Sequence, residues 1–267
     1  MASRNGLGPK IRGLKGVGFG RALPNVFSFS KGFIGNTSSD CFSVPHLVGQ
    51  TVPAKFTVEF WTNLSSAWSG SIDNEAGFFG MKDTANKHFD IQAGGSPGAY
   101  VCYGQGTQAN CVFTNVPGVR NHVVCRWDTV NNVMTSCVNG NLATMVTAGA
   151  GAYSPLPIAA FFCYFAYTNG FPGSRFMDEW RFYDVYISDQ EIVTNYNGGI
   201  GNNPSVTEHL QVWYQFEQFE TLDFSLAQDG SNMKLGMRDM SGKNNHGLPA
   251  TGMNTTVGSG GYVLQTF

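Results

Sequence analysis

Residues 121–140 read NHVVCRWDTVNNVMTSCVNG. Two β-type runs flank a polar turn at residues 129–132, and this arrangement predicts a β-hairpin. In the first run Val123, Cys125 and Trp127 stand at alternate positions. Alternate residues of a strand share one face, so we expect these three side chains to point into a core.

Residues 176–199 read FMDEWRFYDVYISDQEIVTNYNGG and join one more alternating strand to a short helix. Ser188 is the expected N-cap, and Glu191 three residues later completes a capping box. Ile192 and Tyr196 are four positions apart and therefore share one face of that helix.

The composition indicates an all-β protein. The chain has 267 residues, of which 42% are apolar, 13% aromatic and only 13% charged, and it contains 34 glycines. Such a chain can bury a sizeable core and needs many tight turns. Phe56, Val58 and Phe60 alternate within a further strand candidate. Apart from the short helix, long windows with a 3.6-residue apolar period are missing from the sequence.

Four motifs in this order resemble the concanavalin A-like, laminin-G-type (LamG/pentraxin) β-sandwich. They are FTVEFW at 56–61, HVVCRWD at 122–128, CVNG at 137–140 and MDEWRFYD at 177–184. Upstream, FSFSKGFIGNTSSDCFSVP looks like the family's opening strand and turn, so the resemblance covers residues 25–199. It implies an all-β, two-sheet antiparallel jelly-roll sandwich. Because this sandwich carries many activities, it does not fix a function.

A C-terminal extension, residues 200–267, begins with a Pro/Asn/Gly-rich linker at residues 199–208. Its LQVWYQFEQFE and RDMSGKNNHGLPATGM segments resemble the N-terminal strand and turn of the same superfamily. Either they complete the edges of the preceding sandwich or they are the vestige of a second domain. About seventy residues is marginal for an independent core, so we expect the extension to pack on the sandwich or on a neighbour. The order of motifs is similar to LamG-like structural proteins of marine tailed bacteriophages.

Charge is unevenly distributed along the chain. Residues 1–39 hold six cations and no acid, which leaves 16 − 6 = 10 cations against 18 acids, or −8, for the remainder. The Gly-rich segment 1–24 cannot bury enough surface to fold alone. It is a solubilising tail, an arm ordered by an acidic neighbouring subunit, or a non-specific nucleic-acid contact. As an assembly arm its contacts would come from Arg4, Lys10, Arg12, Lys15 and Arg21.

The sequence shows neither a signal peptide nor a membrane span, because the longest apolar run, residues 157–167, is about half the length a span requires. We therefore expect synthesis in a host cytoplasm, with no membrane partner. Six cysteines would allow three disulfides in a secreted chain, and Cys125 and Cys137 could face each other across the hairpin. Without a secretion signal, thiols are favoured.

A catalytic role is not expected. A retaining glucanase needs two carboxylates about 5 Å apart across the sugar, which alternate positions of one strand would supply. Asp178 and Glu179 are adjacent, so on a regular strand they would point to opposite faces, and Glu59 stands alone between apolar residues. The serines and histidines have no nucleophile-elbow context.

A structural Ca²⁺ is the one cofactor we consider. Sandwiches of the resembled superfamily often hold Ca²⁺ at one rim, and Asn36, Asp40 and Asp178 occupy the matching region. Carboxylate and amide oxygens are ligands suited to this hard cation. The alternative is turn capping by the same side chains. Lys31 weighs against the metal, because it stands where an acidic residue would help.

Aromatic residues in turn-like sequence are the candidates for a carbohydrate site or a subunit interface. Both kinds of contact use exposed aromatic rings, and the sequence leaves the two open. The residues are Trp68, Tyr153, Tyr167, Asn169 and Phe171.

Two functional classes follow. The first is a non-enzymatic virion structural protein of a bacteriophage, either a capsid decoration or fibre or a tail component. It would form a homo-oligomer in the particle and contact other virion proteins. Its lectin-like sandwich would be presented to host-surface or environmental glycans. The second is a free carbohydrate-binding module. Specific nucleic-acid binding is not expected of either class.

Overall fold

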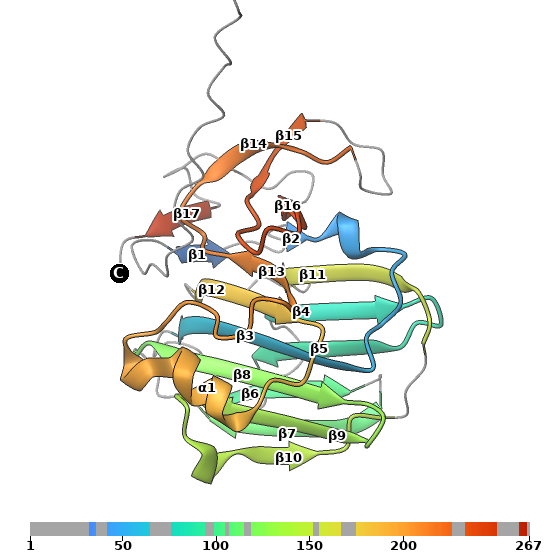
Figure 1. Ribbon diagram of the computed structural model, residues 1–267, viewed down its shortest axis with the longest axis vertical. Coiled ribbons are helices and arrows are strands. Elements are labelled where there is room, and N and C mark those ends of the chain that lie inside the picture. Colours follow the sequence, from blue (N-terminus) through green and yellow to red (C-terminus); the bar gives the residue numbers. More distant parts are fainter. Residues whose placement is uncertain are drawn as a thin grey trace, which may run out of the picture.

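The computed structural model describes residues 32–35, 42–64, 76–93, 99–104, 107–114, 119–151, 155–166, 175–225, 233–249 and 262–265. Within these ranges the chain forms two large antiparallel sheets, a two-stranded ribbon and short helices (Figure 1). The expected all-β, two-sheet jelly-roll sandwich is confirmed.

The first sheet has eight strands in the order β10-β9-β8-β3-β12-β1-β17, with β13 also paired to β12. β1 and β13 share one edge of β12, because β1 pairs with its first residues and β13 with its last ones. The strands are β1 (Gly32–Gly35), β3 (Lys55–Leu64), β8 (Asn121–Asp128), β9 (Val133–Val138), β10 (Val146–Ala148), β12 (Arg175–Tyr183), β13 (Leu210–Tyr214) and β17 (Tyr262–Gln265).

The second sheet has seven strands in the order β16-β2-β11-β4-β5-β6-β7. Its strands are β2 (Phe42–Ser43), β4 (Ala76–Asp83), β5 (His88–Ala93), β6 (Ala99–Gly104), β7 (Thr107–Thr114), β11 (Ile158–Ala166) and β16 (Leu248–Pro249). The ribbon, which we call the C-terminal ribbon, consists of β14 (Phe219–Asp223) and β15 (Met233–Met237). The helices are η1 (Pro45–Leu47), η3 (Leu142–Thr144), α1 (Asp189–Tyr196) and η4 (Asn197–Gly199).

The core between the sheets is rich in aromatic rings, as the alternating sequence predicts. Phe56, Val58 and Phe60 of β3 all point into it. Trp127 of β8 stacks on Phe56 with ring centroids 4.7 Å apart, and its Nε1 donates to the carbonyl of Tyr103 at 3.1 Å. Offset and edge-to-face ring contacts of this kind add to the free energy gained by burying apolar area.

The predicted hairpin is present as β8 and β9, joined by a turn at residues 129–132. However, Cys125 and Cys137 do not face each other. Cys125 pairs with Ser136 and lies in the core between the sheets, whereas Cys137 belongs to a cluster on the opposite face of the strand pair. The offset of one residue puts the two thiols on different faces, so no bridge joins them.

The predicted helix is α1, which covers the outer face of the eight-stranded sheet. Ser188 caps it, and the capping box with Glu191 is complete. Ile192 is buried, and the ring of Tyr196 stacks on Trp61 with centroids 5.9 Å apart. Trp61 is therefore buried beneath α1 and not between the sheets.

Residues after 200 add strands to both sheets. β13 pairs with β12 in the first sheet, and β16 pairs with β2 at the edge of the second. β17 pairs with β1. Figure 1 shows the C-terminal ribbon at one end of the sandwich, close to β16 and β2. The division of the chain at residues 24 and 199 stays a prediction.

Candidate functional site

Of the candidate site residues, only Asp178 falls in the part of the chain that the structure describes. The remaining candidates lie outside the described residues. They are Trp68, Tyr153, Tyr167, Asn169 and Phe171 for glycan or subunit contacts, Arg4, Lys10, Arg12, Lys15 and Arg21 of the arm, and Asn36 and Asp40 for Ca²⁺.

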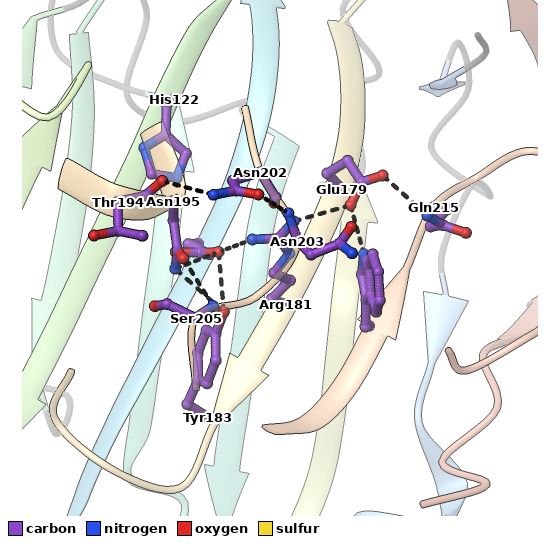
Figure 2. Close-up of polar contacts among 12 residues, drawn as sticks. His122, Glu179, Arg181, Tyr183, Thr194, Asn195, Asn202, Asn203, Ser205 and Gln215 are labelled. Atoms are coloured by element: carbon purple, nitrogen blue, oxygen red, sulfur yellow. Dashed lines mark hydrogen bonds and ion pairs between the residues drawn. The ribbon is translucent and has the colours of Figure 1, made fainter. Parts of the chain in front are cut away.

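A polar network that the sequence did not predict lies between the eight-stranded sheet and α1 (Figure 2). Its centre is an ion pair between Glu59 of β3 and Arg181 of β12, which are direct cross-strand partners. Arg181 Nη1 lies 2.5 Å from Glu59 Oε1, and both side chains are 1% exposed. Two buried charges at this distance stabilise the fold only if their remaining polar atoms are also satisfied.

Neutral donors complete the environment of Glu59. The hydroxyl of Tyr183 donates to Oε1 at 3.0 Å, and Asn195 Nδ2 of α1 donates to Oε2 at 2.9 Å. The Nε2 atom of His122 stands 3.6 Å from the same Oε2. The network therefore joins β3, β8, β12 and α1, and it fixes the helix to the sheet.

A second carboxylate, Glu179, approaches Arg181 from the other side. Its Oε2 lies 3.2 Å from Arg181 Nη2 and accepts a 2.5 Å hydrogen bond from Trp213 Nε1. Gln215 Nε2 donates to Oε1 at 3.3 Å, and the carbonyl of Asn202 accepts from Arg181 Nη2 at 2.6 Å. One guanidinium thus serves two carboxylates and a linker carbonyl, which suits its fork of N–H donors.

The expectation that Asp178 and Glu179 point to opposite faces is wrong, because β12 is irregular here. Its register against β3 shifts between Asp178 and Arg181, and Glu179 adopts a φ of 49°. A bulge inserts one extra residue and offsets the alternation. Met177 and Trp180 consequently both reach the core, with the two carboxylates between them.

Electrostatics keep the network ionised. Burial alone would raise the pKa of Glu59, but Arg181, His122 and Asn195 together lower it to about 2. Burial likewise opposes the charge on Arg181, and attraction to Glu59 outweighs it and raises the pKa of the guanidinium. A carboxylate held in this way neither donates a proton nor meets a substrate, so the geometry favours cohesion over acid/base catalysis.

Asp178 is the residue of this region whose side-chain hydrogen bonding is incomplete among the described residues. Its Oδ1 accepts from the backbone N–H of Glu179 at 2.8 Å, while Oδ2 is buried and has no hydrogen-bond partner among the described residues. Burial, followed by repulsion from Glu179 and Glu217, raises the pKa of Asp178 well above its usual range, and Arg120 opposes the shift. An unsatisfied buried oxygen of this kind is suited to bind a cation.

The described residues do not assemble a complete metal site. They contain no group of three or more His, Cys, Asp or Glu side chains placed to hold an ion. Asp178 is the one predicted Ca²⁺ ligand that the structure describes, and the other two, Asn36 and Asp40, lie outside the described ranges, so the calcium site stays a prediction.

Comparison with known proteins agrees with this geometry. The two sheets and their order define a jelly-roll sandwich, and the family model of the Concanavalin A-like lectin/glucanases superfamily (Laminin_G_3) matches residues 36–193, more than half of the chain. The chain belongs to this superfamily. No curated protein matches the sequence. No helix in the described ranges is long and apolar enough to cross a membrane.

Solved structures are similar to this chain at low sequence identity. A "putative carbohydrate binding protein" of Bacteroides ovatus is 18% identical with a TM-score of 0.52, covering 89% of this chain and 60% of its own. The binding domain of botulinum neurotoxin DC in complex with SialylT is 12% identical (TM-score 0.42; 54% of this chain, 35% of that chain). A heptameric SAP-like pentraxin of Limulus polyphemus is 12% identical (TM-score 0.44; 63% and 83%). This chain thus spans 60% of the length of the Bacteroides ovatus protein and 35% of the length of the neurotoxin binding domain.

Proposed function

We propose that this protein is a non-catalytic, carbohydrate-binding β-sandwich module. The observation that carries the proposal is the closed network beneath α1. Glu59 and Glu179 are both buried and both bonded to Arg181, so neither is available as a nucleophile or as a proton donor to a sugar. Membership of a superfamily that includes lectins, and a structural neighbour described as a putative carbohydrate binding protein, support glycan as the ligand class.

The aromatic residues Trp68, Tyr153, Tyr167 and Phe171, with Asn169, are the proposed glycan contacts. Aromatic rings in loops stack on sugar faces, and an amide provides hydrogen bonds to hydroxyls. Single alanine variants should lose binding on a glycan array while keeping the wild-type melting temperature. Val130, exposed in the β8–β9 turn, is a matched control whose substitution by Ala should leave binding unchanged. Sugar release from β-glucans by the wild-type protein at enzyme-like rates would refute the non-catalytic assignment.

We further propose that the module is a structural component of a bacteriophage virion, where it forms a homo-oligomer and contacts other virion proteins. Two observations support this setting. The order of sequence motifs resembles phage LamG-like structural proteins, and residues 1–39 hold six cations without an acid, suited to an acidic neighbouring subunit. A free carbohydrate-binding module remains the second candidate, because the glycan proposal requires no particle.

The arm distinguishes these two settings. Deleting residues 2–24 should leave circular dichroism and the melting temperature near those of the full chain, because ordering such a segment opposes folding by about 1 kcal/mol or more per residue. The same deletion should abolish incorporation into particles. Full occupancy of the truncated protein in virions would refute the role of the arm. Absence of the full-length protein from all particles would favour the free module.

A further inference from the structure

Three aromatic rings from three separate segments meet where the C-terminal ribbon contacts the sandwich. His46 belongs to η1, Phe224 follows β14, and His246 precedes β16. The ring centroids of His46 and Phe224 are 6.0 Å apart, those of Phe224 and His246 6.0 Å, and those of the two histidines 6.4 Å. Phe224 is fully buried and His246 is 7% exposed. We call these three residues the ring cluster.

The hydrogen bonding of His246 fixes its protonation state. Its Nδ1 accepts a hydrogen bond from the backbone N–H of Asp239 at 3.1 Å, so Nδ1 carries no proton and the folded ring is neutral. The carboxylate of Asp239 in turn accepts from the N–H groups of Trp213 and Asn245, each at 2.9 Å. A proton on Nδ1 would therefore disrupt the turn that joins β15 to β16 and hydrogen-bonds to β13.

The ring cluster also joins the ribbon to the second sheet. Leu222 and Phe224 of the ribbon form a small buried cluster against Leu248, the first residue of β16. Gly236 of β15 is required for this contact, because a Cβ there would lie 2.7 Å from the ring of Phe224. The ribbon has a second apolar attachment at its base, where Phe219 stacks on Phe42 and Met237 of β15 lies buried in the core between the sheets.

Charged groups of both signs surround the cluster. Burial is the largest influence that lowers the pKa of His246, and Arg238 and His46 act in the same direction. Asp239 and Glu220 oppose it, but Glu220 is itself paired with Arg238. The exposed Asp223, whose own pKa both histidines help to lower, also favours positive charge on them. A histidine whose folded-state pKa is depressed contributes stability that is present above its unfolded value of 6.5 and lost as the pH falls below it.

We propose that the ring cluster is an acid-released latch, in which protonation of His246 and His46 frees Leu222 and Phe224 from the sandwich. Both histidines lie against the same buried ring, so charging them places two cations next to Phe224 and Arg238. Release would expose Leu222 and Phe224, which are buried in the structure. Phe219 and Met237 pack with the core between the sheets and would keep the base of the ribbon attached, and the sandwich, whose core contains neither histidine, would stay folded.

Hydrogen exchange of the full-length protein at pH 7.5, 6.5 and 5.5, corrected for intrinsic rates, tests the latch. Protection of amides in 219–224 and 233–249 should fall relative to 121–138, by up to about tenfold per pH unit for each histidine that takes up a proton. In His246→Asn the amide oxygen can still accept from Asp239 N–H but does not titrate, so this fall should be reduced to the part that His46 contributes. Unchanged relative protection in the wild type, or an unchanged fall in the variant, overturns the proposal.

Asp90→Asn is the matched control. Burial raises the pKa of Asp90 to about 6, so this group titrates in the same pH range, but it lies on β5 beside His88. Its replacement should leave the response of the ribbon as in the wild type, and loss of the response would assign it to Asp90 and overturn the latch. If His246→Asn is unprotected already at pH 7.5, His46→Gln provides the test: a reduced pH response supports the latch, and a wild-type response overturns it.

Discussion

The two faces of the eight-stranded sheet are both buried, but by different chemistry. The face toward the second sheet packs rings against rings, as in the stacks of Phe56 with Trp127 and Phe60 with Phe78. The face beneath α1 holds Glu59 and Arg181 in a hydrogen-bonded network. Apolar packing is non-directional and independent of pH, whereas the network depends on every partner being present and ionised. The two faces should therefore respond differently to mutation and to acid.

The largest effect is expected for Arg181→Met. Removing the guanidinium leaves Glu59 and Glu179 buried without their shared cation, which should destabilise the fold by about 5 kcal/mol. Urea unfolding at pH 7 measures this loss. Adding Glu59→Gln and Glu179→Gln to the variant should recover part of it, because no uncompensated charge then remains buried. A single variant as stable as the wild type would contradict the ionic character of this face.

Trp127→Ala should destabilise the apolar face by about 4 kcal/mol, through lost burial and the cavity that remains. Trp127 is fully buried and contacts Phe56, Phe79 and Phe89. Unlike the loss in Arg181→Met, this loss should be the same at pH 7 and pH 4. A soluble variant with an unchanged melting temperature would refute the placement of the ring in the core.

Acid pH should affect the stability of the two faces differently. Because the pKa of Glu59 is lowered from 4.5 to about 2, its contribution is present above pH 4.5 and is lost as the pH falls toward 2. The shift corresponds to about 3 kcal/mol of stability. Urea unfolding at pH 6, 4 and 3 should show this loss in the wild type and a shallower one in Glu59→Gln. Equal slopes for the two proteins would mean that other carboxylates dominate acid unfolding.

Calcium tests Asp178 of β12, which keeps one carboxylate oxygen without a hydrogen-bond partner among the described residues. If Asp178 binds Ca²⁺ together with Asn36 and Asp40, adding the ion at about 100 times its dissociation constant should stabilise the protein by about 2.7 kcal/mol. Asp178→Asn should remove this response to Ca²⁺, while the matched surface variant Asp223→Asn should keep it. A melting temperature of the wild type unaffected by millimolar Ca²⁺ would exclude the site.

The sequence predicted one face much better than the other. Alternation at Phe56, Val58 and Phe60 identified the inward side of β3, because apolar periodicity directly reflects burial. It could not identify Glu59 as a network centre, since its partner Arg181 is 122 residues away in the chain. The sequence did not predict the bulge at Glu179 either. A signal for the network was present in Glu179, Arg181 and Tyr183, which are polar residues at alternate positions on a strand that is otherwise apolar.

The smallest effect is expected at α1, the element that closes the ionic face. Ser188 Oγ accepts from the N–H of Glu191 at 3.2 Å, and the Glu191 side chain accepts from the N–H of Ser188. Ser188→Ala should destabilise the helix by about 1 kcal/mol, because one N–H loses its acceptor. The loss should appear first as faster hydrogen exchange in 189–196, since α1 is short, and Val193→Ala on the exposed side of the helix provides a comparison without the cap. If Ser188→Ala leaves exchange in α1 unchanged, the helix is held by its contacts with the sheet, among them those of Ile192, Asn195 and Tyr196, and these contacts, not the cap, determine whether the ionic face stays closed.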